Sequence, residues 1–196
     1  DGGKDAVVVR EFNTVEKKFV SNGFNLPEGK HRIAWMDNDT ILVATDFGPG
    51  TLTESGYPFI VKALNRGQKL ANAVEVFKGS ARDGGYGVSP ELMRSSSGQV
   101  IAVIISRPLD TFRQETYELV GVRPVKLDLP QRVNVRGVLS SGQPRLVFSI
   151  DEAWKVNNTT APTGALMAVP MAMLKPPPPG VGAVLLERGR GLGAGH

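Results

Sequence analysis

Short apolar strands separated by turn residues recur along almost the whole chain, and this recurrence is what most constrains the fold. In residues 33–46, two runs with alternating apolar residues flank the polar turn Asp37-Asn38-Asp39-Thr40. An echo of this hairpin returns about every 40 to 50 residues, a spacing typical of repeat architectures. The pattern therefore predicts several small sheets rather than one continuous sheet.

The predicted strands form one pair followed by three sets of four. The pair is Ala6–Phe12 and Glu16–Val20, placed around Asn13-Thr14, and the turn-rich stretch Ser21–Lys30 comes next. The sets are His31–Met36, Ile41–Asp46, Phe59–Leu64 and Ala73–Phe77; Pro90–Arg94, Gln99–Ser106, Thr116–Val120 and Pro124–Leu129; and Asn134–Leu139, Arg145–Ile150, Gly164–Val169 and Val184–Glu187. Sets of four short strands predict the blades of a β-propeller.

Two segments leave alternatives open. Residues Val100–Ile105 form a continuous apolar run, which suits a strand buried on both faces but does not by itself exclude a helix. Residues Leu64–Val76 have some helical composition, although Asn65, Gly67 and Asn72 argue against a helix.

We therefore predict an all-β fold, a partial β-propeller of about three and a half four-stranded antiparallel blades. The propeller portion is expected over residues 1–175, and residues 176–196 are expected to form a Pro/Gly-rich tail that is disordered or poorly packed. The first pair resembles the outer half of a blade whose inner half lies upstream. The alternative is that the two ends of the chain close a ring, strand against strand.

Composition excludes some partners. The 23 basic and 19 acidic residues are interspersed, so the net charge of +4 predicts no nucleic-acid surface. No run of 18 or more apolar residues predicts a membrane span. Cysteine is absent, and the compartment stays open between periplasm and cytoplasm.

No pattern typical of a catalytic site occurs. No serine has glycines two residues before and after it, and Ser95–Gly98 and Ser140-Ser141-Gly142 are interpreted as hairpin turns. Of the two histidines, His31 opens a predicted strand and His196 ends the Gly-rich tail, so neither a triad base nor a zinc site is expected. We predict no catalytic, cofactor-binding or metal-binding residue, and hence no cofactor.

Two motifs superficially suggest ligands. Asp37-Asn38-Asp39 begins like a calcium loop, but Ile41 and Leu42 stand where that loop needs an oxygen ligand and a glycine, so a β-turn is the better interpretation. Gly84–Gly87 and Gly191–Gly195 lack the Lys-Ser/Thr of a phosphate loop and are interpreted as ordinary loops.

The connection Asp46–Pro58 is the best place to expect function, because it is long and has no strand pattern. Its aromatic residues Phe47 and Tyr57 are candidates for contact with a substrate channel or with another domain. The alternative is a loop that only packs on the neighbouring blade.

Ordered segments of this chain resemble the propeller of bacterial prolyl oligopeptidase-like serine peptidases. The similarity runs over about residues 3 to 170 and is carried by short segments rather than by one motif. The segments are Lys4–Phe12, Thr45–Gly50, Ser55–Pro58, Arg66-Gly67, Glu75–Gly79, Glu115–Tyr117, Val125–Pro130, Trp154–Val156 and Gly164–Val169.

The resemblance implies a non-catalytic propeller portion of a larger peptidase. In that family the propeller admits short peptides to a Ser-Asp-His site on an α/β-hydrolase domain, so that domain and short peptides are the expected partners. The open sheet edges also predict self-association. A free-standing propeller that binds a protein or a ligand is the alternative. A glycosidase-like or lactonase-like enzyme is less favoured, because no Asp, Glu or His recurs from blade to blade.

Overall fold

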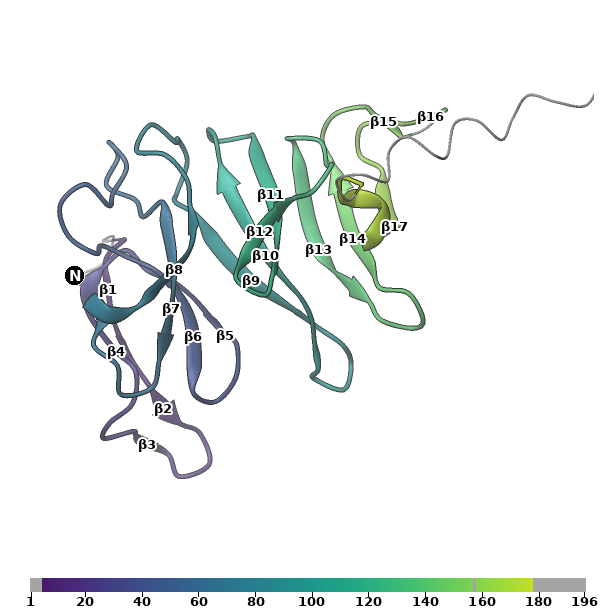
Figure 1. Ribbon diagram of the computed structural model, residues 1–196. Helices are drawn as coiled ribbons and strands as arrows, with labels where there is room; N and C mark the ends of the chain where they lie inside the picture. The colour runs from purple at the N-terminus through teal and green to yellow at the C-terminus, as the bar shows by residue number, and fades with distance from the viewer. Residues whose placement is uncertain (1–4, 157, 178–196) are drawn as a thin grey trace, which may run out of the picture.

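The computed structural model describes residues 5–156 and 158–177, and antiparallel strands dominate this part of the chain (Figure 1). An N-terminal group contains β1 (Val7–Arg10), β2 (Phe12–Asn13), β3 (Lys18–Phe19) and β4 (Asn25–Gly29). The first sheet contains β5 (Arg32–Trp35), β6 (Thr40–Ala44), β7 (Ile60–Asn65) and β8 (Val74–Lys78), in that order. The 3-10 turn η1 (Leu70–Asn72) lies between β7 and β8.

Two further sheets follow. The second sheet contains β9 (Ser89–Arg94), β10 (Val100–Pro108), β11 (Gln114–Val120) and β12 (Arg123–Lys126). The third sheet contains β13 (Val133–Leu139), β14 (Arg145–Ile150) and β17 (Leu166–Pro170). A small hairpin of β15 (Trp154–Val156) and β16 (Thr159–Ala161) is inserted before β17, and the 3-10 turn η2 (Met171–Leu174) follows it.

The sets predicted as the first two blades are confirmed, strand for strand, by the first and second sheets. The third sheet has three strands among the described residues, and the predicted fourth strand, Val184–Glu187, lies outside them, as does the predicted tail from residue 178 on. The predicted all-β class and partial propeller are thus confirmed. The described residues form two sheets of four strands, one of three strands, and three two-stranded pairs, β1–β4, β2–β3 and β15–β16.

The pairing expected near the N-terminus is wrong in part. Only the short strands β2 and β3 form a hairpin, with Phe12 opposite Phe19, whereas β1 pairs with β4, a segment expected to be turn. Pro27 and Gly29 give that segment the composition of a turn, but Leu26 is almost fully buried and holds the strand against the first sheet. Pro27 is tolerated because β4 pairs on one side only.

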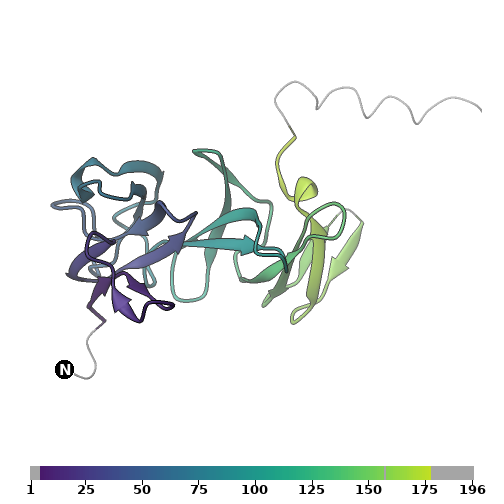
Figure 2. The same cartoon turned by 90° about the horizontal axis from the view of Figure 1, so that it is seen from below.

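The sheets follow one another side by side in chain order, as Figure 1 shows and the view from below in Figure 2 repeats. Successive side chains of a strand point to opposite faces, and in β6 they enter two different cores. Ile41 and Val43 pack toward the N-terminal pair, and Leu42 and Ala44 pack toward the second sheet. The sheets are therefore stacked as layers with a hydrophobic core in each gap.

Strand β10 has the same arrangement one layer further along. Val103 and Ile105 enter the core shared with the first sheet, and Ala102 and Ile104 enter the core shared with the third sheet. The apolar run of residues 100–105 is thus a strand buried on both faces, which settles the strand-or-helix alternative.

In the described part of the chain, no helix is long and apolar enough to cross a membrane.

Candidate binding cavity

The two ends of the strands carry different kinds of connection. Hairpins of a few residues join β5 to β6, β9 to β10, β11 to β12 and β13 to β14 at one end. The longer connections, residues 45–59, 79–88 and 151–165, gather at the other end, which we call the long-loop face (Figure 1). Binding residues are most often carried by loops of this kind on a rigid scaffold, so this face is the place to search for a site.

A cavity of about 520 Å³ opens on the long-loop face between the second and third sheets. This volume is within the range of small-molecule and peptide sites, roughly 300–1,000 Å³. Its walls come from the starts of β9 and β13, from the loop between β10 and β11, and from the connection that precedes β9. The first residue of β5, Arg32, reaches it from the first sheet.

Four guanidinium groups line the cavity, those of Arg32, Arg113, Arg132 and Arg136. Arg113 is neutralised by Asp110, with its Nε 2.6 Å from Oδ2. Within residues 5–156 and 158–177, no carboxylate lies within ion-pair distance of the other three. The cavity thus holds positive charge that the described residues do not neutralise by ion pairs.

The three arginines without a carboxylate partner are exposed, and each contacts another group. The guanidinium of Arg32 donates to the carbonyl oxygen of Tyr86 at 3.3 Å. Nε and one terminal nitrogen of Arg136 donate to Oγ of Ser149 at 3.2 and 3.1 Å. Arg132 lies 5.8 Å from the ring centroid of Phe112. A guanidinium has five N–H donors, so each of these groups keeps donors for a ligand.

Three carboxylates also line the cavity, those of Glu91, Asp110 and Asp151. Asp110 accepts hydrogen bonds from the backbone N–H groups of Phe112 and Arg113 and from the Arg113 guanidinium, and these bonds lower its pKa below the usual value. Asp151 accepts from the amide of Asn134 at 2.9 Å. Against four guanidinium groups this leaves an excess of one positive charge.

Alternation along β13 explains why its polar residues meet in the cavity. All five residues from Arg132 to Arg136 border the cavity, but Arg132, Asn134 and Arg136 are exposed, whereas Val133 and Val135 pack in the core between the second and third sheets. The run Arg-Val-Asn-Val-Arg in residues 132–136 is the period-two signal that sequence reasoning had available and did not use.

Tyr57 lies at the rim next to the cavity. Its ring packs edge to face on Tyr86, with centroids 5.6 Å apart, and Tyr86 lines the cavity. The ammonium of Lys30 lies 3.6 Å from the centre of the Tyr57 ring, and the hydroxyl donates to Asp5 at 2.6 Å. The hydrogen bond to the Asp5 carboxylate raises the pKa of Tyr57.

Phe47 lies elsewhere. Its ring packs against the core between the N-terminal pair and the first sheet, with Lys62 Nζ 4.4 Å from its centroid. Neither Phe47 nor Tyr57 is among the residues that line the cavity. Their contact with a substrate channel or another domain stays a prediction.

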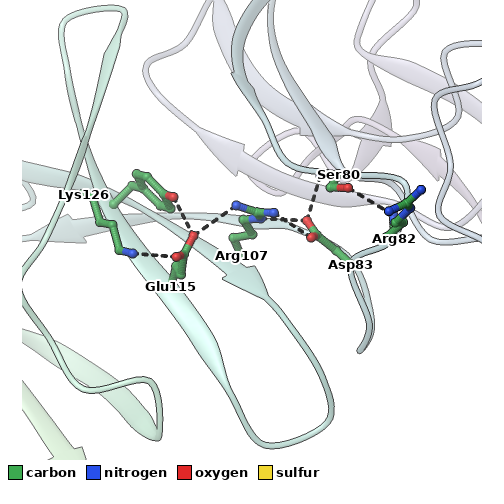
Figure 3. A network of polar contacts seen from close by, with 7 residues as sticks. Ser80, Arg82, Asp83, Arg107, Glu115 and Lys126 are labelled. Carbon is green, nitrogen blue, oxygen red and sulfur yellow. Dashed lines mark hydrogen bonds and ion pairs between the residues drawn. The ribbon is translucent and has the colours of Figure 1, made fainter.

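A polar network holds the connection of residues 79–88 to the second sheet (Figure 3). The guanidinium of Arg107 on β10 donates twice to Asp83 at 2.8 Å and once to Glu115 at 3.1 Å. Lys126 and Tyr117 also donate to Glu115, and Asp83 accepts from the backbone N–H of Ser80. The network thereby fixes the loop that brings Gly85, Tyr86 and Gly87 to the cavity.

Burial and charge oppose each other in this network. Burial raises the pKa of Glu115, but the hydrogen bonds from Lys126 and Tyr117 and the charge of Arg107 outweigh it, so the pKa lies below the usual value. The hydrogen bonds to Asp83 raise the pKa of Arg107 despite its burial. Both groups are therefore charged at neutral pH.

The other sequence motifs are structural where the described residues include them. The His31 ring bonds to Oγ1 of Thr45 at 2.7 Å and to the carbonyl oxygen of Pro27 at 2.8 Å, so it fastens β5 to its neighbours. Asp37 accepts from the N–H of Asp39 at 2.8 Å, as expected of a β-turn. Among the described residues, no group of three His, Asp or Glu side chains is arranged to hold a metal ion.

No family model matches the chain. It is 44% identical over 117 residues to an uncharacterized peptidase of Sinorhizobium fredii, an alignment that includes 59% of this chain and 16% of that relative. It is 25% identical over 187 residues to an uncharacterized peptidase of Rickettsia prowazekii, which includes 86% of this chain and 24% of the relative. The chain therefore spans only about a sixth to a quarter of the length of these peptidases.

A solved structure has the same fold. A post-proline cleaving enzyme of Rickettsia typhi superposes with a TM-score of 0.77 over 89% of this chain and 26% of the other, at 24% identity. The predicted resemblance to a bacterial peptidase of the prolyl oligopeptidase kind is confirmed.

Proposed function

We propose that this chain is a non-catalytic part of the propeller of a prolyl oligopeptidase-like serine peptidase, where it restricts the access of substrates to the catalytic site. The observation that carries the proposal is the succession of stacked sheets in a chain whose relatives are peptidases. A stack of sheets around an axis leaves a passage of limited width, which selects substrates by size.

The long-loop face is the part of this chain that would meet the catalytic domain. Its connections are the longest in the described residues, and the cavity opens among them. This arrangement supports a role as a scaffold whose long-loop face contacts the catalytic domain, while its tight hairpins lie at the opposite end of the strands.

Labelling with a fluorophosphonate probe tests the proposal. The intact parent protein should be labelled at a serine and should cleave a proline-containing chromogenic peptide, whereas the 196-residue chain alone should do neither. Heat-inactivated samples of both proteins set the background.

Each half of the proposal has its own contrary result. Labelling of this chain above background would contradict its non-catalytic part. A parent that is folded yet neither labelled nor active would contradict the peptidase part.

A further inference from the structure

We propose that the arginine-lined cavity binds the carboxylate of a peptide and so orients the peptide on the long-loop face. The inference rests on the proposed function only for the identity of the ligand as a peptide. The carboxylate preference follows from the cavity itself.

The first argument is charge. Arg32, Arg132 and Arg136 approach the cavity from two different sheets, and the described residues provide no carboxylate within ion-pair distance of any of them. Guanidinium groups bind carboxylates through pairs of parallel hydrogen bonds, which makes arginine the residue best suited to recognise a planar anion.

The second argument is preorganisation. Ser149 holds Arg136 and the carbonyl oxygen of Tyr86 holds Arg32, so part of the side-chain entropy that a ligand would otherwise have to offset is already lost. Arg132 immediately precedes β13 and Arg136 lies four residues further on, and both line the cavity, so two donor groups surround one space.

The third argument is the position of Glu91. This carboxylate lines the same cavity from β9, opposite β13, and repels an anion placed between the strands. An anion in the cavity therefore binds away from Glu91 and close to Arg132 and Arg136. Removing the charge of Glu91 should strengthen binding.

Isothermal titration of the 196-residue chain with three related peptides tests the inference. The first is acetyl-Ala-Pro-Ala with a free carboxylate, the second is its C-terminal amide, and the third is acetyl-Glu-Pro-Ala amide, whose carboxylate is on a side chain. The free acid should bind at least about tenfold tighter than the amide, a factor typical of one charge-assisted interaction. The third peptide shows whether the C-terminus or a side chain supplies the carboxylate.

Matched variants locate the effect. Arg132→Gln and Arg136→Gln should each weaken binding of the free acid by about three- to tenfold and should reduce its preference over the amide. Arg123→Gln removes the same charge from an exposed position on β12 that does not line the cavity and should change neither. Glu91→Gln should tighten binding of the free acid. Thermal unfolding of each variant verifies that it is folded.

Equal affinity for the acid and the amide overturns the inference, and so does an Arg123→Gln variant that weakens binding as much as the β13 variants. If this chain binds the acid and the amide equally while the parent protein is labelled by the fluorophosphonate, the cavity inference is wrong and the proposed function stands. If the parent protein is not labelled while this chain still binds the acid more tightly than the amide, the proposed function is wrong and the cavity inference stands.

Discussion

At the scale of single residues, the loop that shapes the cavity depends on a glycine. Gly87 has a φ of +87°, and a Cβ there would lie 2.9 Å from the carbonyl oxygen of Pro58. That oxygen already accepts the N–H of Val88 at 2.9 Å, so the backbone has little freedom to move away. Only glycine meets both demands.

Gly87→Ala should therefore destabilise the chain more than the backbone conformation alone explains. The control is Gly98→Ala in the β9–β10 hairpin, where φ is +84° but nothing lies within 4 Å of the new Cβ. We expect the control to cost about 1–2 kcal/mol for the left-handed conformation and Gly87→Ala to cost more. Urea denaturation of both variants measures the difference, and equal costs would show that the contact with Pro58 relaxes freely.

Glu115 makes stability depend on pH. Its folded pKa is below the usual 4.5, so its contribution to the free energy of unfolding is complete above that value and is lost as the pH falls through the folded pKa. Glu115→Gln should cost about 1–3 kcal/mol at pH 7, because Arg107 and Lys126 lose a charged acceptor. The cost should shrink toward pH 3.

Denaturant unfolding at several pH values checks the expected pH dependence. Glu75→Gln, on the exposed side of β8, is the matched control and should cost little at any pH. A Glu115→Gln cost that stays constant from pH 7 to pH 3 would mean that lost packing, not lost charge, destabilises the variant.

At the scale of strands, β10 tests the stacking of layers. Ile104 and Ile105 are adjacent and fully buried but belong to different cores. We expect Ile104→Ala and Ile105→Ala each to lower the free energy of unfolding by about 2–5 kcal/mol. Val74→Ala, at the exposed first residue of β8, should have a small effect. If Ile104→Ala were neutral in urea unfolding, the third sheet would not pack on the second.

Strands were predictable from the sequence where alternation or an apolar run met clear turn residues. β5 to β14 follow this rule, and β10 was recognised although its two-sided burial removes the alternation. Strand β4 was missed because Asn25, Pro27 and Gly29 have turn propensities that the contacts of Leu26 override. The β15–β16 hairpin was missed because its strands are only three residues long.

The cavity was less predictable than the strands. Its residues come from three sheets and from loops far apart in the sequence. Arg32 and Arg136 border the same cavity only because of the way the sheets pack side by side. Long connections such as Asp46–Pro58 pointed to the long-loop face but not to the residues that line its cavity.

At the scale of the whole molecule, the described residues leave the outer strands of each sheet with an unpaired edge. Strands β1 and β17, the first and last of the stacked sheets in chain order, are two of these: β1 pairs only with β4, and β17 pairs only with β14. Unpaired edges offer backbone hydrogen bonds to other chains, so we expect the isolated chain to self-associate.

Charged substitutions at those edges should reduce the self-association. Val8→Lys on β1 and Leu166→Lys on β17 introduce a charge at residues that are 60% and 70% exposed. Val122→Lys, at a hairpin that is 74% exposed, is the control and should leave association unchanged. Sedimentation velocity over a range of concentrations measures the result. A chain that stays monomeric throughout would contradict this expectation.

Each hydrophobic core in this molecule is formed by the facing sides of two neighbouring sheets, and we call such a contact between two sheets a seam. A seam depends only on the two sheets that meet in it, as in other repeat architectures. Gene duplication of one four-strand unit would then supply both halves of a new seam at once.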